Sequence, residues 1–329
     1  MGILYYRDTS AHIFYLMWMV EIMEKVLIFG VSGFVGNYLS QEFLEHDYEV
    51  YGSDKNNTDM LPDEVKFSSA DLLNAEQTEK VITEVCPDII INLAAISSVG
   101  ASWNMPQTTI SVNVVGALNI LEVARKIEKK PKIMFIGSSE EYVASPFPMN
   151  ENTALDASNP YGISKVTQER FAKLYRDQYG LKIYCVRPFN HTGVGQRDSF
   201  VLPSFCKQAA EIEKSGKPGV ISVGNISVKR DFSHVKDIVR AYRMIVESDN
   251  CDLIYNVGSG TAYSLEDMLR YIVTLSSQEI KIEVDQSRFR PTDQPVICCD
   301  YNLIKTKLGW KPQYTVFDAL KEMFEHFIK

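Results

Sequence analysis

The sequence predicts an α/β protein with a doubly wound parallel sheet and a smaller C-terminal α/β lobe. Three observations lead to this prediction. Short, continuously apolar segments alternate with helix-like patterns between residues 25 and 187, as in parallel sheets whose strands are buried on both faces. A turn with three glycines follows the first of these segments. Beyond residue 188, loops containing glycine and proline separate shorter elements.

Strands and helices are expected in strict alternation through the first part of the chain. The expected strands are 26–29, 48–52, 65–67, 87–95, 132–136 and 181–187, and the expected helices are 37–44, 75–85, 108–129 and 160–179. We therefore assign 23–187 to a nucleotide-binding domain and 188–329 mainly to a substrate lobe. The chain is expected to cross back to the main sheet near 232–257.

The composition is that of an ordinary globular protein with an acidic surface. The 329 residues are 45% hydrophobic and carry a formal net charge of −8. Such a surface argues against nucleic acid and against an anionic membrane as partners. The six cysteines form no C-x-x-C pair, which indicates reduced thiols in a cytoplasmic protein. The five histidines have no ligand spacing, so no metal site is expected.

Residues 1–22 are predicted to be an N-terminal extension with no role in the chemistry. The apolar segment 13–23 is too short to span a bilayer and lacks a small-residue cleavage site. A start at Met23 would lie directly before the first strand. A short anchoring helix is the alternative interpretation.

The glycine-containing turn predicts a Rossmann-type dinucleotide site. Gly30, Gly33 and Gly36 permit a tight turn, a close approach of the backbone to a pyrophosphate and close packing of helix on strand. The start of the following helix, around Phe34 and Val35, offers unpaired N–H groups. An ordinary strand-to-helix turn is the alternative, but the strand before and the helix after favour a nucleotide site.

Residues at the ends of later strands are expected to contact the same cofactor. Asp54 lies 18 positions after Gly36, where an acidic residue meets the ribose hydroxyls, and this favours NAD. Lys55 beside it can accept a 2′-phosphate, so NADH and NADPH both remain candidates. Asp71 is expected near the adenine edge. The remaining predicted cofactor contacts are small or apolar residues: Leu72, Leu93, Ala94 and Ala95.

Tyr161 and Lys165 are the candidate proton-transfer pair. Their i, i+4 spacing places them on one face of a helix. A neighbouring ammonium and a cationic nicotinamide ring lower the pKa of a phenol, which suits Tyr161 to proton exchange near neutral pH. Lys165 would also hold the nicotinamide ribose. The pair follows a strand that ends in Ser138 and Ser139, at the sheet edge where ligands bind. On its own, such a pair is common on helix surfaces.

Taken in chain order, these motifs resemble the extended short-chain dehydrogenases/reductases, in the branch that modifies nucleotide sugars. The spacing G-x-x-G-x-x-G is that family's cofactor signature, and the resemblance runs from about Lys25 to the C-terminus. It implies that Ser138 hydrogen-bonds the reacting sugar oxygen, that Tyr161 is the acid/base and that Lys165 is its partner. It also implies hydride transfer between a nicotinamide and C4 of the sugar.

Three later segments resemble the family's substrate-binding segments. The stretch Arg187-Pro188-Phe189-Asn190 implies that Asn190 meets the sugar diphosphate. The stretch Arg230-Asp231-Phe232 implies that Arg230 lies near the nucleotide, and Arg290-Pro291-Thr292-Asp293 implies a pyrophosphate clamp. The substrate-binding residues that the resemblance implies are Ser139, Asn190, Arg230, Arg290 and Asp293.

Within this branch, the chain most resembles reductases of GDP-4-keto-6-deoxy-D-mannose, which form GDP-D-rhamnose. The sister dehydratases carry an elimination acid where Glu140 stands, so Glu140 is a further catalytic candidate. Those dehydratases have threonine in place of Ser138, and Val143 replaces the glycine usual in the branch. Alternatives are therefore a GDP-mannose 4,6-dehydratase, a nucleotide-sugar 4-epimerase and a non-catalytic NAD(P)-binding regulator, although the last would be expected to lack the Tyr161–Lys165 pair.

The family resemblance also implies a homodimer. In the family, the helices corresponding to 108–129 and 160–179 pack against their copies in a second subunit as a four-helix bundle. The apolar stripes of both helices are equally compatible with packing inside one chain.

Overall fold

The computed structural model describes residues 23–58, 60–248, 254–286 and 294–329. The predicted extension 1–22 and the substrate candidates Arg290 and Asp293 lie outside the described residues. In the described part of the chain, no helix combines the length and the apolarity needed to cross a membrane.

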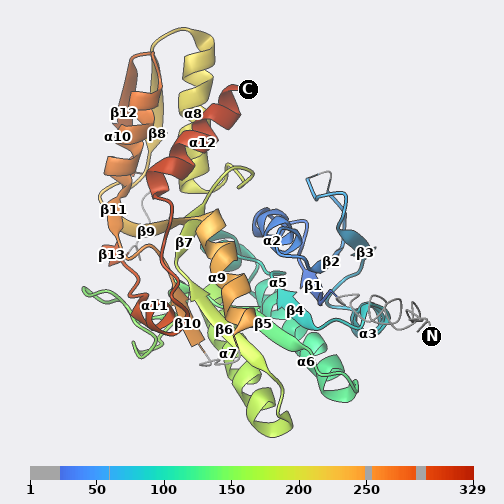
Figure 1. Ribbon diagram of the computed structural model, residues 1–329. Coiled ribbons are helices and arrows are strands. Elements are labelled where there is room, and N and C mark those ends of the chain that lie inside the picture. Colours follow the sequence, from blue (N-terminus) through green and yellow to red (C-terminus); the bar gives the residue numbers. More distant parts are fainter. Residues whose placement is uncertain (1–22, 59, 249–253, 287–293) are drawn as a thin grey trace, which may run out of the picture.

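Seven parallel strands form the main sheet, in the order β10-β6-β5-β4-β1-β2-β3 (Figure 1). Six of them come from the first part of the chain: β1 (Lys25–Phe29), β2 (Glu49–Asp54), β3 (Lys66–Ser69), β4 (Ile89–Asn92), β5 (Lys132–Ile136) and β6 (Ile183–Pro188). The seventh, β10 (Ile254–Val257), returns from the C-terminal half and pairs with β6. The predicted doubly wound parallel sheet is confirmed.

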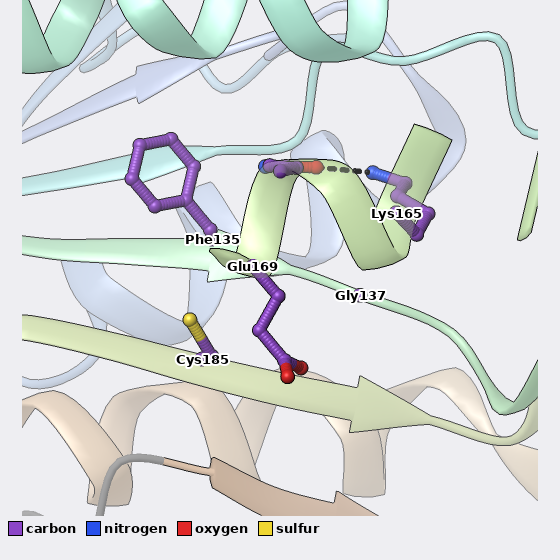
Figure 2. A pocket seen from close by; sticks show the side chains of 6 residues that line it. Phe135, Gly137, Lys165, Glu169 and Cys185 are labelled. Atoms are coloured by element: carbon purple, nitrogen blue, oxygen red, sulfur yellow. Dashed lines mark hydrogen bonds between the residues drawn. The ribbon is translucent and has the colours of Figure 1, made fainter. Parts of the chain in front are cut away.

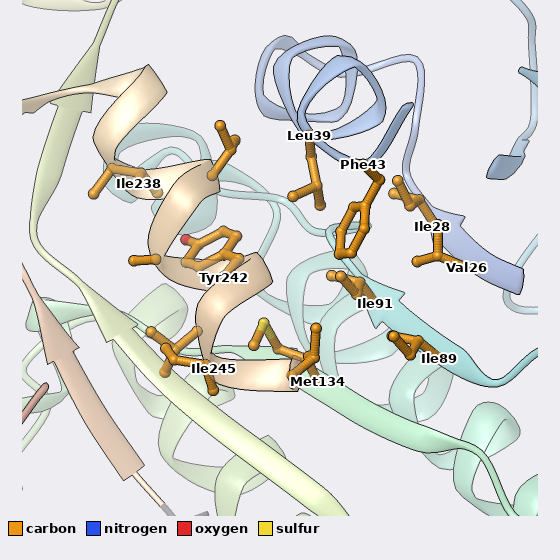
Figure 3. Packing of buried hydrophobic residues seen from close by; sticks show 14 of the residues in the cluster. Val26, Ile28, Leu39, Phe43, Ile89, Ile91, Met134, Ile238, Tyr242 and Ile245 are labelled. Atoms are coloured by element: carbon orange, nitrogen blue, oxygen red, sulfur yellow. The ribbon is translucent and has the colours of Figure 1, made fainter. Parts of the chain in front are cut away.

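Helices cover both faces of this sheet, and the strands alternate their side chains between two cores. On one face, Ile28 and Ile91 pack against Leu39 and Phe43 of α2 (Phe34–Leu44) and against Tyr242 of α9 (Val235–Glu247) (Figure 3). On the other face lie α3 (Ala75–Val85), α6 (Gly116–Lys126) and α7 (Pro160–Tyr179). Burial on both faces explains why the strand segments read as continuous apolar runs.

The prediction of one regular helix over 108–129 is wrong in its bounds and in its regularity. The helix begins at Pro106 as α5 (Pro106–Ile110), widens into a π-helical turn η1 (Ser111–Val115) and ends with α6 at Lys126. Proline suits the first turn because its missing N–H would have no helical partner there. In the widened turn, the side chain of Asn113 accepts a hydrogen bond from the backbone N–H of Ile96 and donates one to the hydroxyl of Ser164. A short helix, α4 (Val99–Asn104), precedes it.

The remaining elements form a second body of structure. One small sheet contains β7 (Asn190–Thr192), β9 (Lys229–His234), β11 (Ala262–Ser264) and β13 (Val296–Ile297). A second pairs β8 (Gly219–Val223) with β12 (Ile280–Val284). The helices here are α8 (Val201–Ser215), α10 (Leu265–Leu275) and α12 (Val316–Ile328), whereas α11 (Asn302–Leu308) packs against β10 and the core of the main sheet. A separate apolar core joins α8, α10 and α12 to the β8–β12 pair (Figure 1).

Candidate active site

The glycine-containing turn lies directly against the end of β4. Gly30 has a φ of +78°, and a Cβ there would lie 2.5 Å from the backbone nitrogen of Ala94. The N–H of Gly33 donates to the carbonyl oxygen of Gly30 at 3.2 Å and closes the turn. Gly33 is also the N-cap of α2, and it supplies no side chain to bond the first N–H groups of that helix. Free N–H groups and the positive helix end suit a pyrophosphate.

Gly36 allows α2 to approach the strand, and replacing it with alanine is expected to weaken both fold and cofactor binding. A Cβ at this position would overlap the backbone of Val31. Gly36→Ala is therefore expected to lower the free energy of unfolding by about 2 kcal/mol and to weaken NAD(P)H binding. Urea denaturation and fluorescence titration of the reduced cofactor measure the two effects. Gly33→Ala is the matched control for stability, because its tightest contact is 3.3 Å; an equal loss in both variants would contradict the overlap.

An ion pair joins two of the three charged residues that were predicted to meet the adenosine, Lys55 after β2 and Asp71 after β3. The Nζ of Lys55 lies 3.0 Å from Oδ2 of Asp71. Asp54 accepts a hydrogen bond from the backbone N–H of Lys55 at 2.7 Å. In the structure the Asp71 side chain is thus directed to Lys55, and the role of Asp54 at the ribose stays a prediction. Leu72 is buried against Gly116 of α6, whereas Leu93, Ala94 and Ala95 are half-buried just beyond β4.

Ser138, Tyr161 and Lys165 are brought together where β5 and α7 meet. Ser138 is the N-cap of the short 3₁₀ turn η2 (Ser139–Glu141), and its hydroxyl lies close enough to Tyr161 to lower the pKa of that phenol. Asn159 caps α7, and Pro160 occupies its first turn, so that Tyr161 begins the helix at the sheet edge. The Nζ of Lys165 lies 5.9 Å from the centroid of the Tyr161 ring. The arrangement has the geometry of a proton-transfer site.

A second set of contacts fixes Lys165 from behind. Its Nζ donates to the carbonyl oxygen of Ile136 at 2.7 Å and to Oε1 of Gln168 at 3.2 Å (Figure 2). The pocket behind it, lined also by Phe135, Gly137, Glu169 and Cys185, has no room for a water molecule. The ammonium group is therefore held by protein atoms on this side. The role of Gln168 was not predicted from the sequence, although residues three positions apart on a helix, such as Lys165 and Gln168, are neighbours.

Burial dominates the ionisation of the pair. It raises the pKa of Tyr161 well above its usual value, and the charges of Glu141 and Glu140 add to that rise, while the Ser138 hydrogen bond opposes it. Burial also lowers the pKa of Lys165 to about 8, against the opposing influence of Glu141. The expectation that the neighbouring ammonium lowers the pKa of Tyr161 is thus outweighed by desolvation, and the phenol keeps its proton at neutral pH.

Glu140 lies next to this pair and is held by the cap of α7. Its Oε2 accepts from Nδ2 of Asn159 at 2.9 Å, while Oδ1 of Asn159 accepts the N–H of Gly162 at 2.9 Å. One asparagine side chain thus fixes both the start of the helix and the carboxylate. The Asn-Pro step at 159–160 is a helix-start signal that could have identified this residue.

Arg187, which begins the segment that contains Asn190, forms a buried ion pair. It is almost fully buried and donates to both carboxylate oxygens of Glu169, at 2.9 and 2.6 Å. Its NH1 also donates to the hydroxyl of Tyr142 at 2.8 Å. Glu141, fully buried beside it, was likewise missed, although two adjacent glutamates directly after an apolar strand are an unusual pattern.

The other predicted substrate residues lie in the second body of structure or at its border. Asn190 begins β7, and Ser139 is buried in η2. Arg230 donates to the carbonyl oxygens of Lys229 and Gln294, at 2.9 and 2.7 Å. The described residues do not place these side chains in contact with Tyr161.

One contact that sequence reasoning missed connects the two halves of the site. The imidazole of His191 stacks on the Phe34 ring of the glycine turn, with centroids 6.3 Å apart and planes 11° from parallel. Burial lowers the pKa of His191, which is therefore neutral at pH 7. Within the described ranges, no cluster of three or more histidine, cysteine or acidic side chains could hold a metal ion.

Comparisons with known proteins agree with this geometry. The family described as GDP-mannose 4,6 dehydratase matches residues 27–323. GDP-6-deoxy-D-mannose reductase of Pseudomonas aeruginosa is 28% identical over 91% of this chain and 95% of its own length. GDP-mannose 4,6 dehydratase 2 of Arabidopsis thaliana is 30% identical over 93% of this chain and 87% of its own length.

Solved structures extend the match to the fold. The structure of RMD from Pseudomonas aeruginosa complexed with NADPH has a TM-score of 0.80 and 26% identity, and the match covers 93% of this chain and 99% of that one. The family's enzymes depend on NAD(P) and act on nucleotide sugars. The chain thus belongs to the GDP-mannose 4,6-dehydratase family of extended short-chain dehydrogenases/reductases.

Proposed function

We propose that this protein is a nucleotide-sugar 4-ketoreductase, which uses NADPH or NADH to reduce the C4 ketone of GDP-4-keto-6-deoxy-D-mannose to GDP-D-rhamnose. The observation that carries the proposal is the meeting of Ser138 at the start of η2, Tyr161 in the first turn of α7 and Lys165, which is fixed beside Tyr161, at the carboxyl edge of the sheet. The similarity to the curated reductase along almost the whole chain supports it.

The residues present fit a dinucleotide. The turn from Gly30 to Gly36 and the uncapped start of α2 would hold its pyrophosphate, Asp54 its adenosine ribose and Lys165 its nicotinamide ribose. When bound, the reduced nicotinamide supplies the hydride for C4. The side chains of Asp54 and Lys55, at the adenosine ribose, would determine whether NADH or NADPH is preferred.

The protein's own part in the reaction is proton transfer and orientation. Ser138 would hydrogen-bond the C4 oxygen and polarise the ketone. Tyr161 would donate the proton from its hydroxyl, which its high pKa keeps protonated. The positive charge of Lys165 would stabilise the phenolate that results. Residues 188–329 would hold the GDP portion, with Asn190 and Arg230, and Arg290 and Asp293 of the segment outside the described residues, as candidate contacts.

A specific observation also favours a second candidate, the 4,6-dehydratase. Glu140 is near enough to Tyr161 for its charge to influence the pKa of the phenol, and it is held by Asn159. An acid beside the proton donor suits elimination of water across C5 and C6 of the hexose. The 30% identical dehydratase gives this candidate similar family support. A 4-epimerase has the support of a putative epimerase structure from Burkholderia cenocepacia with a TM-score of 0.83.

One assay separates these activities. The purified protein is mixed with GDP-4-keto-6-deoxy-D-mannose and NADPH or NADH, and absorbance of the reduced nicotinamide is followed. Stoichiometric consumption with formation of a GDP-6-deoxyhexose is the expected result. Conversion of GDP-mannose alone to the keto sugar would instead establish the dehydratase. Interconversion of C4 epimers without net cofactor consumption would establish the epimerase.

We also propose that two copies associate through α5–α6 and α7. Ile163 and Leu174 of α7 and Ile110 of α5 are large apolar side chains exposed to solvent. Sedimentation equilibrium is expected to give twice the monomer mass, and Ile163→Glu is expected to raise the dissociation constant at least about tenfold. Val220→Glu, at a similarly exposed position on β8, should leave the mass unchanged. A wild-type monomer would rule out the dimer.

The setting we propose is the cytoplasm. The five cysteines in the described ranges are all free thiols, as expected in a reducing compartment.

A further inference from the structure

The carboxyl group of Glu141 is built into the turn that carries Ser138. Its Oε1 accepts the backbone N–H of Ser138 at 2.7 Å, and the Ser138 hydroxyl accepts the N–H of Glu140 at 3.1 Å, so the two residues cap the turn reciprocally. A Cβ at Gly137 would overlap this carboxyl, which therefore needs a glycine before Ser138. Glu141 thus fixes the backbone from which the Ser138 hydroxyl reaches Tyr161.

The second oxygen of the same group has no matching donor. Oε2 of Glu141 is buried and makes no hydrogen bond, and it lies 3.6 Å from Nε of Arg187. The guanidinium group of Arg187 donates its short hydrogen bonds to Glu169 and Tyr142 instead. Two carboxyl groups therefore face one buried positive charge, and a second negative charge there would be poorly compensated.

The protonation of Glu141 follows from that crowding. Burial, and then the charge of Glu169, raise the pKa of Glu141 to about 8, while Arg187, the Ser138 N–H and Lys165 oppose the rise. The charged and titratable groups that face it are Arg187 and Cys185 on β6 and Glu169, Lys165 and Tyr161 on α7, while Glu140 and Tyr142 are its neighbours in sequence. At neutral pH the group is mainly an uncharged acid.

Glu141 acts electrically on both members of the proton-transfer pair. Its charge raises the pKa of Tyr161 and also that of Lys165. When Glu141 loses its proton, both residues therefore hold theirs more tightly. The effect matters in the range around pH 8, where Lys165 and Glu141 both titrate.

We propose that Glu141 is a positioning residue of this site: its carboxyl group fixes Ser138 through the backbone, and its negative charge favours the protonated form of Lys165. The kinetic part of this proposal rests on the reductase function proposed above. The electrostatic part does not, because it concerns the protein alone.

Two variants separate the two roles in steady-state kinetics. Glu141→Leu removes the acceptor for the Ser138 N–H and is expected to lower kcat about tenfold to a hundredfold with KM nearly unchanged. Glu141→Gln keeps a carbonyl acceptor and is expected to retain kcat near pH 7. Because glutamine cannot become an anion, Lys165 loses its proton at lower pH, and the alkaline limb of the pH–rate profile is expected to move to lower pH.

The matched control is Glu151→Gln. Glu151 is a half-buried carboxylate that also accepts a backbone N–H, from Asn256 at 2.8 Å, and no hydrogen bond joins it to the Ser138 turn in the described residues. Its profile should coincide with that of the wild type. Coincident alkaline limbs for Glu141→Gln and the wild type, or full kcat in a folded Glu141→Leu, would overturn the proposal.

A substrate-free measurement keeps this inference distinct from the proposed function. Protein labelled with ¹³C at the lysine ε-carbons is titrated by NMR, and the Lys165 signal is assigned by its loss in Lys165→Arg. Lys165 is expected to titrate at lower pH in Glu141→Gln than in the wild type; identical titrations would refute the electrostatic role. A wild type that turns over no nucleotide sugar would refute only the reductase, and this titration would still decide for or against Glu141.

Discussion

Tyr161→Phe is expected to lower kcat for reduction by about 10³-fold while leaving NAD(P)H affinity unchanged. The phenol is the proton donor of the proposed reaction, it lies beside Ser138, and burial keeps it protonated. Phenylalanine preserves the ring packing and removes only the hydroxyl with its transferable proton. Steady-state kinetics at pH 7, with fluorescence titration of the reduced cofactor, measures the two quantities separately.

Tyr184→Phe is the matched control for this loss. Tyr184 is also buried, and its hydroxyl donates to the backbone carbonyl of Ser248 at 2.9 Å, at the opposite end of the sheet from Ser138. The control should lose some stability and keep its kcat. If Tyr161→Phe retained more than a tenth of wild-type kcat, the proton would have to come from another group, and Glu140 would be the next residue to replace.

Arg187→Leu is expected to lower the free energy of unfolding by about 3–5 kcal/mol. The substitution leaves Glu169 without the guanidinium that bonds both of its oxygens, and it removes the donor to the Tyr142 hydroxyl. Since these groups are largely buried, water cannot replace the lost contacts at low cost. Urea denaturation monitored by circular dichroism gives the difference.

Arg270→Leu provides the comparison at the surface. Arg270 also donates twice to a glutamate, Glu266, but its side chain is 68% exposed. A loss of less than about 1 kcal/mol is expected there. The double variant Arg187→Met/Glu169→Met should recover part of the stability, because apolar side chains of similar length can replace a buried ion pair. Equal losses for Arg187→Leu and Arg270→Leu would show that burial does not set the cost.

Local signals explain what could be predicted from the sequence. The helices 75–85 and 160–179 begin and end in the structure at the predicted residues, because Asn74 and Asn159 cap their first turns and Gly180 ends the second in a left-handed conformation. Likewise, Tyr161 and Lys165 are four positions apart on one helix. The turn from Gly30 to Gly36 is a contiguous motif, which needs no long-range information to be recognised.

The unpredicted features all depend on contacts between distant segments. The sequence assigns no partner to Arg187, and only the packing of β6 against α7 brings it to Glu169. In the sequence, Glu141 looks like a surface glutamate, and only the structure shows that it is fully buried. The pKa of Tyr161 depends on burial, which spacing along a helix does not reveal. The widened turn at 111–115 contains Asn113, whose side chain accepts a hydrogen bond from Ile96, 17 residues earlier in the chain.

The return of β10 to the main sheet has a consequence for biosynthesis. Until Ile254–Val257 has been synthesised, β6 is an open edge with unpaired N–H and C=O groups, and until α9 has formed, Ile28 and Ile91 lack part of their cover. A nascent chain that ends near residue 188 therefore exposes an edge strand that can pair with other chains, and a sheet with one face only partly covered. The main sheet therefore cannot be completed until the chain has been synthesised as far as β10. We expect the nascent chain to be bound by chaperones at that stage of translation.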